Sequence, residues 1–282
     1  MISADRVAAA GQLACLLEVS APKPGNVSPE RHFHDTRYED FLASAVAIGP
    51  ALAAAGKQPL GVTIRRAVED TLRWTRSNTN LGIVLLLAPL AKAAQMSGTP
   101  LRNQLATVLA GTTVEDAAEV YAAIRQARPG GLGSSTAEDV TRAPTVTLRE
   151  AMALAAERDA IAREYVSDFK LTFEVGVPAL LAARREGLPW TDAVVDTYLG
   201  LLEAVPDTHI ARKLGAAEAK AISLRARAAR AQGGTRSAAG RRALGDLDRE
   251  LRDPRNRRNP GTTADLTCAA LFVVILEGGW DR

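Results

Sequence analysis

Five short segments of this chain combine glycine or proline with side chains that can bind phosphate or a metal ion. Packing of a helical bundle requires no such segments. Because rigid turns hold Asn, Thr and Asp at predicted helix starts, we predict a polar site for a phosphorylated ligand and a divalent metal. The segments are Lys23 to Val27, His34 to Phe41, Asn78 to Gly82, Asp207 to Lys213, and Asn259 to Asp265.

The first and third segments offer groups that suit phosphate. Lys23 is a point charge on a stiff proline backbone, and Gly25-Asn26 permits close approach of a ligand. Asn78 and Thr79 precede the most apolar stretch of the chain, where a helix start presents free N–H groups, and Gly82 follows them. A solvated loop lysine and plain helix capping are the alternatives, although capping needs only one of these polar residues.

Acidic residues in the second segment indicate a metal site. Asp35 and Glu39 are four residues apart and Asp40 follows, so like charges share a helix face if the helix starts early. A bound Mg²⁺ would relieve their repulsion, and stabilisation of a helix N-terminus by acids is the alternative. Zinc is not expected, because no further ligand is spaced to join His32 and His34.

Two further acids stand at predicted helix starts. Asp207 and Asp265 each either cap a helix or bind a metal, and the cations Arg212 and Lys213 follow Asp207 by about one turn. The small residues beside these acids, which we expect to contact the same ligand, are Thr208, Gly261, Thr262 and Thr263.

Other catalytic patterns are absent from the sequence. The glycine-rich run 129–135 lacks a preceding strand and a Gly-Lys-Ser/Thr ending, so we interpret it as a mobile linker or lid. Cys15 and Cys268 lie in apolar stretches and are predicted to be buried small hydrophobes. With no Gly-x-Ser-x-Gly and no Cys–His pair, covalent serine or cysteine catalysis is not expected.

Composition predicts the scaffold that positions these residues. The chain has 282 residues with 47% hydrophobic but only 4% aromatic content, so Ala, Leu and Val must fill the core. We predict a single all-α domain over residues 1–282, with about ten to twelve helices. The net charge of +3 suits an anionic small molecule as well as nucleic acid. We predict the small molecule, and neither nucleic acid nor a membrane, as the partner of a cytoplasmic protein.

Helical periodicity divides the chain into segments joined by turns. The unusually apolar segment 81–94 is expected at the centre of the fold. That segment and the exposed, charged segment 236–252 leave room for a homodimer. The predicted helices cover residues 4–19, 36–48, 61–76, 81–94, 99–110, 112–127, 147–165, 168–186, 191–204, 207–231, 236–252 and 262–277.

The ordered motifs resemble those of the triphosphoribosyl-dephospho-CoA synthases over almost the whole chain. That family's Lys-Pro-Gly-x-Val loop corresponds to residues 23–27, and its Asp followed by Glu-Asp-Phe corresponds to Asp35 and residues 39–41. Its Asn-Thr-x-x-Gly, its Asp-Thr before a basic pair and its Pro-Gly-x-[Ser/Thr]-Ala-Asp-Leu correspond to residues 78–82, 207–208 and 260–266.

The resemblance implies an all-α, Mg²⁺-dependent transferase with ATP as its glycosyl donor. Adenine leaves, and the triphosphoribosyl group passes to a hydroxyl of 3′-dephospho-CoA. The product is the precursor of the prosthetic group of the citrate lyase or malonate decarboxylase carrier protein.

Roles for individual residues follow from matching that chemistry to the motifs. We expect Asp35 and Asp265 to bind the metal and to stabilise the positive charge that develops at the ribose. Asp40 is expected as a further metal ligand, and Asp207 as a second ligand or base. Phosphate contacts are expected from a second group: Lys23, Gly25, Asn26, Asn78, Thr79, Gly82, Thr208, Arg212, Lys213, Gly261, Thr262 and Thr263.

Departures from the family pattern keep other acceptors open. Asn80-Leu81 replaces a His-Lys pair, and Thr262-Thr263 stands where the CoA-type enzymes have Gly-Ser. The Asn-Thr-Asn-Leu-Gly form resembles relatives in microbes that make tetrahydromethanopterin, which suggests a pterin riboside as acceptor. Hydrolysis of an N-riboside is a further alternative, and a non-catalytic nucleotide-binding scaffold is the last.

Overall fold

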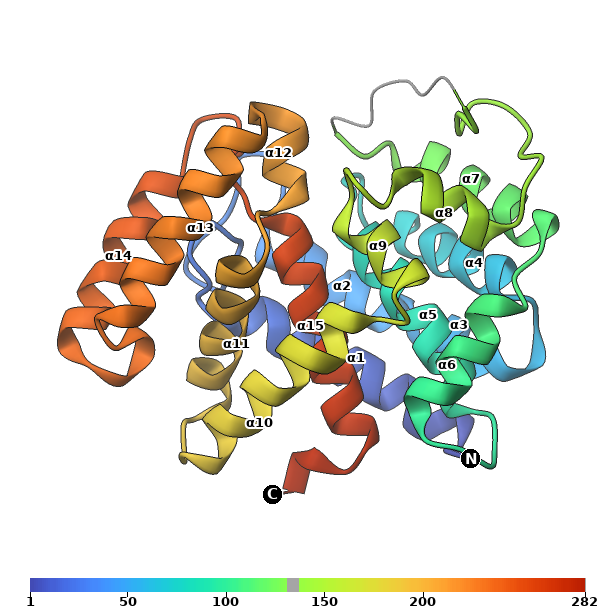
Figure 1. Cartoon of the computed structure of the whole chain (residues 1–282), viewed down its shortest axis with the longest axis horizontal. Helices are drawn as coiled ribbons and strands as arrows, with labels where there is room; N and C mark the ends of the chain where they lie inside the picture. Colours follow the sequence, from blue (N-terminus) through green and yellow to red (C-terminus); the bar gives the residue numbers. More distant parts are fainter. Residues whose placement is uncertain (131–136, 282) are drawn as a thin grey trace.

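The computed structural model describes residues 1–130 and 137–281 and shows an all-α architecture there (Figure 1). It contains no strand within these residues, only one isolated bridge between Ser28 and Arg31. The fifteen α-helices of the described residues are α1 (Ala4–Ser20), α2 (Tyr38–Ala47), α3 (Gly49–Ala54), α4 (Leu60–Leu72), α5 (Leu81–Ala94), α6 (Leu101–Ala110), α7 (Val114–Ala127), α8 (Leu148–Ala155), α9 (Ala160–Val166), α10 (Val177–Arg185), α11 (Trp190–Ala204), α12 (Thr208–Leu214), α13 (Ala216–Ala231), α14 (Ala238–Leu251) and α15 (Gly261–Leu276).

Two helices form the centre of the fold. Every residue of α5 is buried except Gly82 and Lys92, and every residue of α15 is buried except Gly261 and Asp265. A helix that is apolar all round is stable only when other helices cover it, and both α5 and α15 pack against each other and against α1. The prediction of a central helix at 81–94 is therefore confirmed, and α5 is not available as a dimer face.

Small side chains let the central helices approach closely. At Gly11 of α1, an added Cβ would overlap the Leu52 side chain of α3. Cys15 and Cys268 are buried where α1 meets α15, with 3.7 Å between their sulfur atoms, and burial raises the pKa of Cys268. The two cysteines thus act as small core residues, as the sequence predicted.

The helix count exceeds the expected number because local signals divide or add helices. Asp159 accepts hydrogen bonds from the N–H groups of Ile161 and Ala162 and starts α9, which splits the predicted segment 147–165. Gly215, with φ of 93°, separates α12 from α13 within the predicted segment 207–231. Pro50 starts the additional short helix α3.

The helices surround α15 on two sides (Figure 1). One side holds α10 to α14 and the other holds α3 to α9, and the first turn of α15 lies against the first turn of α5. None of the described helices is both long and apolar enough to cross a membrane.

Candidate functional site

A cleft of about 1050 Å³ opens between the two sides of the molecule. The first turns of α5 and α15 line its floor, the start of α9 and the exposed face of α12 line its walls, and α7 and α8 line its far end. Helix N-termini carry partial positive charge and free N–H groups. Because two long helices, α5 and α15, both begin here, the fold itself favours an anionic ligand in the cleft.

The floor is built by close contact between α5 and α15. An added Cβ at Gly82 would overlap the Asp265 carboxylate, so glycine is required for this approach. Asn78 accepts a hydrogen bond of 3.1 Å from the Leu81 N–H and thereby starts α5. Thr79 is tied to Ser44 of α2 by a hydroxyl–hydroxyl hydrogen bond. These residues line the cleft.

Asp265 has an unusual electrostatic environment. Burial raises the pKa of its carboxyl well above the usual range, and the nearby Glu18, Asp207 and Asp159 raise it further, while Arg212 lowers it. In the described part of the chain, no hydrogen bond or ion pair to the Asp265 side chain is present. A carboxyl left without a protein partner on the floor of a cleft is suited to meet a cation or a proton.

The other acids near Asp265 each have their own partners. Glu18 forms an ion pair with Lys23, with 3.0 Å between Oε1 and Nζ, and both side chains are almost fully buried. Asp159 pairs with Arg212 across the wall between α9 and α12. Their charges are compensated, so the uncompensated acid of the group is Asp265.

Asp207 joins two helix starts. One carboxylate oxygen accepts the Ile210 N–H of α12 at 3.0 Å. The other accepts both the N–H and the hydroxyl of Thr263 in α15, each at 2.8 Å. The residue is buried, and burial raises the pKa of its carboxyl. Asp207 therefore holds α12 against α15 and does not line the cleft, unlike the acid predicted to act as ligand or base.

Several predicted contact residues are likewise placed behind the cleft wall. Lys23 turns inward to Glu18, because a buried acid there needs a cation. Gly25, with φ of 77°, packs on Leu251 of α14, so its lack of a side chain serves the turn. Asp40 accepts the Arg37 N–H at 2.8 Å and caps α2. Thr208 accepts the Ala160 N–H at 3.2 Å, and Thr263 binds Asp207.

The remaining predicted residues do line the cleft. Asp35 lies at its edge, with more than half of its side chain exposed. Asn26 donates a hydrogen bond of 3.0 Å to the buried Tyr198 hydroxyl. The cleft also includes seven predicted residues from the starts of α5 and α15 and from α12: Asn78, Thr79, Gly82, Arg212, Lys213, Gly261 and Thr262.

His209 is a cleft residue to which the sequence assigned no role. Burial lowers the pKa of its imidazole to about 3, and Lys213 and Arg212 lower it further. The ring is therefore neutral and lies beside Gly261, while Arg212 lies 3.5 Å from its Nδ1. Its position after Asp207-Thr208 was the available signal, but the sequence does not show that the ring turns toward the cleft.

Glu18 and Asp159 are further cleft residues that the sequence did not single out, and Asn259, the first residue of the fifth predicted segment, also lines the cleft. Glu18 is an acid within the apolar C-terminal half of α1, and that pattern was a signal in the sequence. The buried Oδ1 of Asn259 accepts no hydrogen bond within the described residues. A ligand donor can satisfy this atom, since buried polar atoms without partners are rare.

The residues present suit Mg²⁺ only if the ligand supplies further oxygen atoms. Within residues 1–130 and 137–281, no group of three or more acidic, His or Cys side chains could hold a metal ion alone. Mg²⁺ is commonly bound by one or two carboxylates together with water and substrate phosphates. Asp265, which has no protein partner there, and Asp35 at the edge fit that pattern, whereas Asp40 is used as a helix cap.

The glycine-rich run 129–135 cannot be assessed as a whole, because residues 131–136 lie outside the described residues. Its described start reaches the cleft. Gly130 lies close to Lys213, since an added Cβ there would be 3.8 Å from the Lys213 Cε.

Comparisons with known proteins agree with this architecture. Residues 4–282 match the family model described as ATP:dephospho-CoA triphosphoribosyl transferase. A solved structure from Archaeoglobus fulgidus, provisionally named a triphosphoribosyl-dephospho-CoA synthase, is similar to this chain with a TM-score of 0.66 and 31% identity. The similarity covers 84% of this chain and 99% of that structure.

Curated relatives carry related names. A probable 2-(5''-triphosphoribosyl)-3'-dephosphocoenzyme-A synthase of Stutzerimonas stutzeri is 28% identical over 270 residues, which are 90% of this chain and 85% of that protein. A protein of the same name from Pseudomonas paraeruginosa is 37% identical over 108 residues, but these are only 37% of this chain and 36% of the relative.

The buried Glu18–Lys23 pair predicts a stability effect at a residue first expected to bind phosphate. Lys23→Met should lower the free energy of unfolding by about 3–5 kcal/mol, because it leaves Glu18 buried and unpaired. Urea unfolding followed by circular dichroism measures this change. The double variant Lys23→Met/Glu18→Gln should recover much of the loss, and a single variant as stable as the parent would show that the pair does not form.

The environment of His209 predicts an unusual titration. Its imidazole should stay neutral until the pH approaches about 3, as measured by NMR of labelled histidine. Because the folded pKa is depressed, the stability that this group contributes is complete above its unfolded pKa of about 6.5 and is lost as the pH falls toward the folded value. Lys213→Ala should raise the pKa of His209. A midpoint near 6.5 in the parent would contradict the buried, cation-flanked position.

Proposed function

The chain belongs to the ATP:dephospho-CoA triphosphoribosyl transferase family, and from this premise we propose that it transfers the triphosphoribosyl group of ATP to a hydroxyl of 3′-dephospho-CoA. It is thus a transferase that uses ATP. The product would be the prosthetic-group precursor of the citrate lyase or malonate decarboxylase carrier protein. The observation that carries the proposal is Asp265, a carboxyl without a protein partner where two helix N-termini meet.

The proposed reaction exchanges one bond at C1′ of the ribose. The C1′–N9 bond of ATP breaks, a bond from the acceptor oxygen to C1′ forms, the acceptor hydroxyl loses a proton and adenine gains one. Positive charge develops at C1′, as it does in glycoside hydrolysis. We propose that the Asp265 carboxylate lies near this carbon and stabilises that charge, because it has no competing partner among the described residues.

The triphosphate requires positive charge around it. Lys213 and Arg212 of α12, together with the free N–H groups at the starts of α5 and α15, are the groups that we propose for its binding. Asp265 and Asp35 would hold Mg²⁺, which when bound neutralises part of the phosphate charge. Asp207 is proposed as a positioning residue, because both of its oxygens are already used by Thr263 and Ile210.

A second acceptor is favoured by one feature of the floor. Asn80 is buried and donates to Thr71 Oγ1 at 3.0 Å, and Leu81 is buried beside it. The cationic side chain that CoA-type enzymes carry at Leu81 is therefore missing here. The same transfer to a pterin riboside, in the biosynthesis of tetrahydromethanopterin, is our second candidate. A cytoplasmic location and a homodimer also stay predictions.

Adenine release from ATP and Mg²⁺ tests the proposal directly by chromatography. Release that depends on 3′-dephospho-CoA supports the first candidate, and release that depends on a pterin riboside supports the second. Release without an acceptor would instead indicate N-riboside hydrolysis. ATP binding with no release under any of these conditions would contradict catalysis and favour a nucleotide-binding scaffold.

Asp265→Asn should lower turnover by about 10²–10³-fold, because an amide cannot ionise when Mg²⁺ and the positive charge at C1′ favour the carboxylate. The folded pKa of Asp265 is raised, so ionisation disfavours the folded state and the parent loses stability as the pH rises through that pKa. The variant should lack this contribution and be at least as stable as the parent at neutral pH. Asp246→Asn, an exposed site on α14, is the control. Unchanged turnover in Asp265→Asn would remove this residue from the mechanism.

Gly82→Ala should also reduce turnover, by about 10²-fold, because the new methyl group displaces the Asp265 carboxylate. Steady-state rates with saturating ATP and acceptor measure the effect. Gly245→Ala in α14 is the matched control, since an added Cβ there has room and alanine favours a helix. Equal rates for the two variants would show that the contact between α5 and α15 does not position Asp265.

A further inference from the structure

The far end of the cleft differs in chemistry from its floor. We call the part lined by α7, α8 and the second turn of α5 the α7–α8 chamber. Its walls are mainly apolar and include one aromatic ring, that of Tyr121. The residues that define it are Leu85, Val120, Tyr121, Ile124, Leu148 and Met152. Such a surface suits a flat or branched apolar group, because its apolar side chains carry no group that binds phosphate.

Three arginines that line the cleft lie next to the helices that form the chamber. Arg125 and Arg128 lie at the end of α7, and Arg158 lies between α8 and α9. Arg125 donates to the Val140 carbonyl and Arg158 to the Leu154 carbonyl at 3.4 Å. In the part of the chain that the structure describes, none of the three forms an ion pair with an acid. Their charge is therefore available for an anionic group on a ligand.

The edge of the chamber is held in place by hydrogen bonds. The Tyr121 hydroxyl donates to the Glu138 carbonyl at 3.0 Å, and burial raises the pKa of this phenol to about 12. The Glu138 carboxylate accepts the N–H and the hydroxyl of Thr145, which lowers its pKa. These hydrogen bonds within the protein fix the position of this wall.

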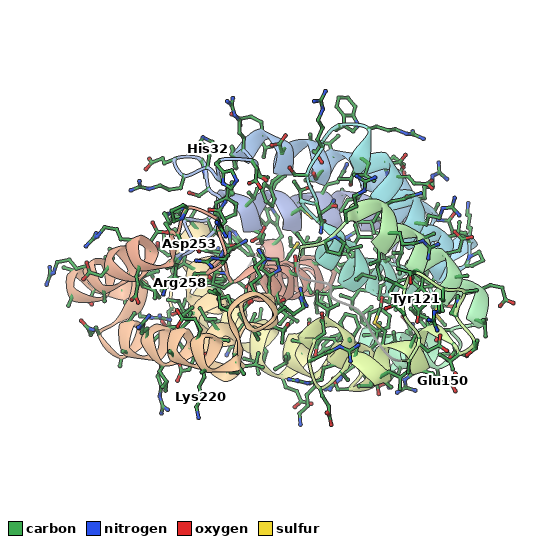
Figure 2. The ribbon with its side chains drawn as sticks, turned by 90° about the horizontal axis from the view of Figure 1, so that it is seen from above. His32, Tyr121, Glu150, Lys220, Asp253 and Arg258 are labelled. Carbon is green, nitrogen blue, oxygen red and sulfur yellow. The ribbon has the colours of Figure 1, made fainter. Side chains whose placement is uncertain are left out.

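The cleft is large enough for two ligands at separate ends. Figure 2 shows Tyr121 on the opposite side of the molecule from Asp253, next to which Arg255 lines the cleft. The cleft volume of about 1050 Å³ is at the upper limit for a site that holds one small molecule. One end offers Lys213, Arg255 and helix N-termini, and the other offers the apolar chamber with its arginines.

We propose that the α7–α8 chamber binds the acceptor of the proposed reaction, by a flat heteroaromatic group and a phosphate of that acceptor. The heteroaromatic group lies against Tyr121 and Met152. The phosphate binds the three arginines, Arg125, Arg128 and Arg158. ATP occupies the other end of the cleft, and its ribose lies over Asp265, between the triphosphate and the chamber. This inference rests on the proposed transfer reaction. It assigns selection of the second substrate to the wall formed by α7 and α8.

Matched variants at the two ends test this division. Met152→Trp fills the chamber. Arg128→Ala removes an arginine that forms no ion pair within the described residues, and Arg255→Ala removes an arginine at the other end of the cleft. The assay measures adenine release with varied 3′-dephospho-CoA, and calorimetry measures Mg²⁺–ATP binding to each full-length variant. Met152→Trp and Arg128→Ala should each raise the KM for 3′-dephospho-CoA at least about tenfold and leave the ATP Kd within about twofold. Arg255→Ala should do the reverse.

The outcomes separate two kinds of failure. If the parent releases no adenine with 3′-dephospho-CoA, the dephospho-CoA form of the proposed function is wrong, and this inference is wrong with it. If the parent turns over but Met152→Trp weakens ATP binding, the chamber holds the adenine of ATP and the inference alone is overturned. Unchanged KM values in both chamber variants would overturn it equally. Circular dichroism confirms that each variant is folded.

Discussion

The contact between the first turns of α5 and α15 is the constraint on which the site depends. Both helices are buried almost all round, so they can only lie at the centre, with other helices on every side. Only a few of their residues are less than fully buried, and two of these, Gly82 and Asp265, face each other at the cleft. The core packing that stabilises the protein thereby also places the acid.

The acids around Asp265 are each paired within the protein, and Asp265 is the one carboxyl among them without a partner in the described residues. Glu18 forms an ion pair with Lys23, and Asp159 forms one with Arg212. Asp207 accepts hydrogen bonds from N–H groups and a hydroxyl at two helix starts. Each of these acids is satisfied within the protein, yet their negative potential still acts on Asp265. A carboxyl kept in this state interacts strongly with a cationic centre that arrives with the substrate, because the low-dielectric surroundings screen little.

Sequence reasoning succeeded where local rules decide the outcome. The apolar run in α5 predicted a buried central helix, and the low aromatic and high alanine content predicted an all-α fold. It undercounted the helices because a capping acid at Asp159 and a positive φ at Gly215 break segments whose periodicity continues across the break. Such breaks depend on single residues, whereas periodicity averages over many.

The sequence by itself determined the fold class, the family and the set of polar segments from which the cleft is built. Only the tertiary structure decided which members of each segment reach the ligand. Lys23 turns inward to Glu18, Asp207 joins α12 to α15, and the neighbouring His209 turns to the cleft. The reason is that residues one or two positions apart point in different directions, and the partner that claims each side chain lies far away in the chain.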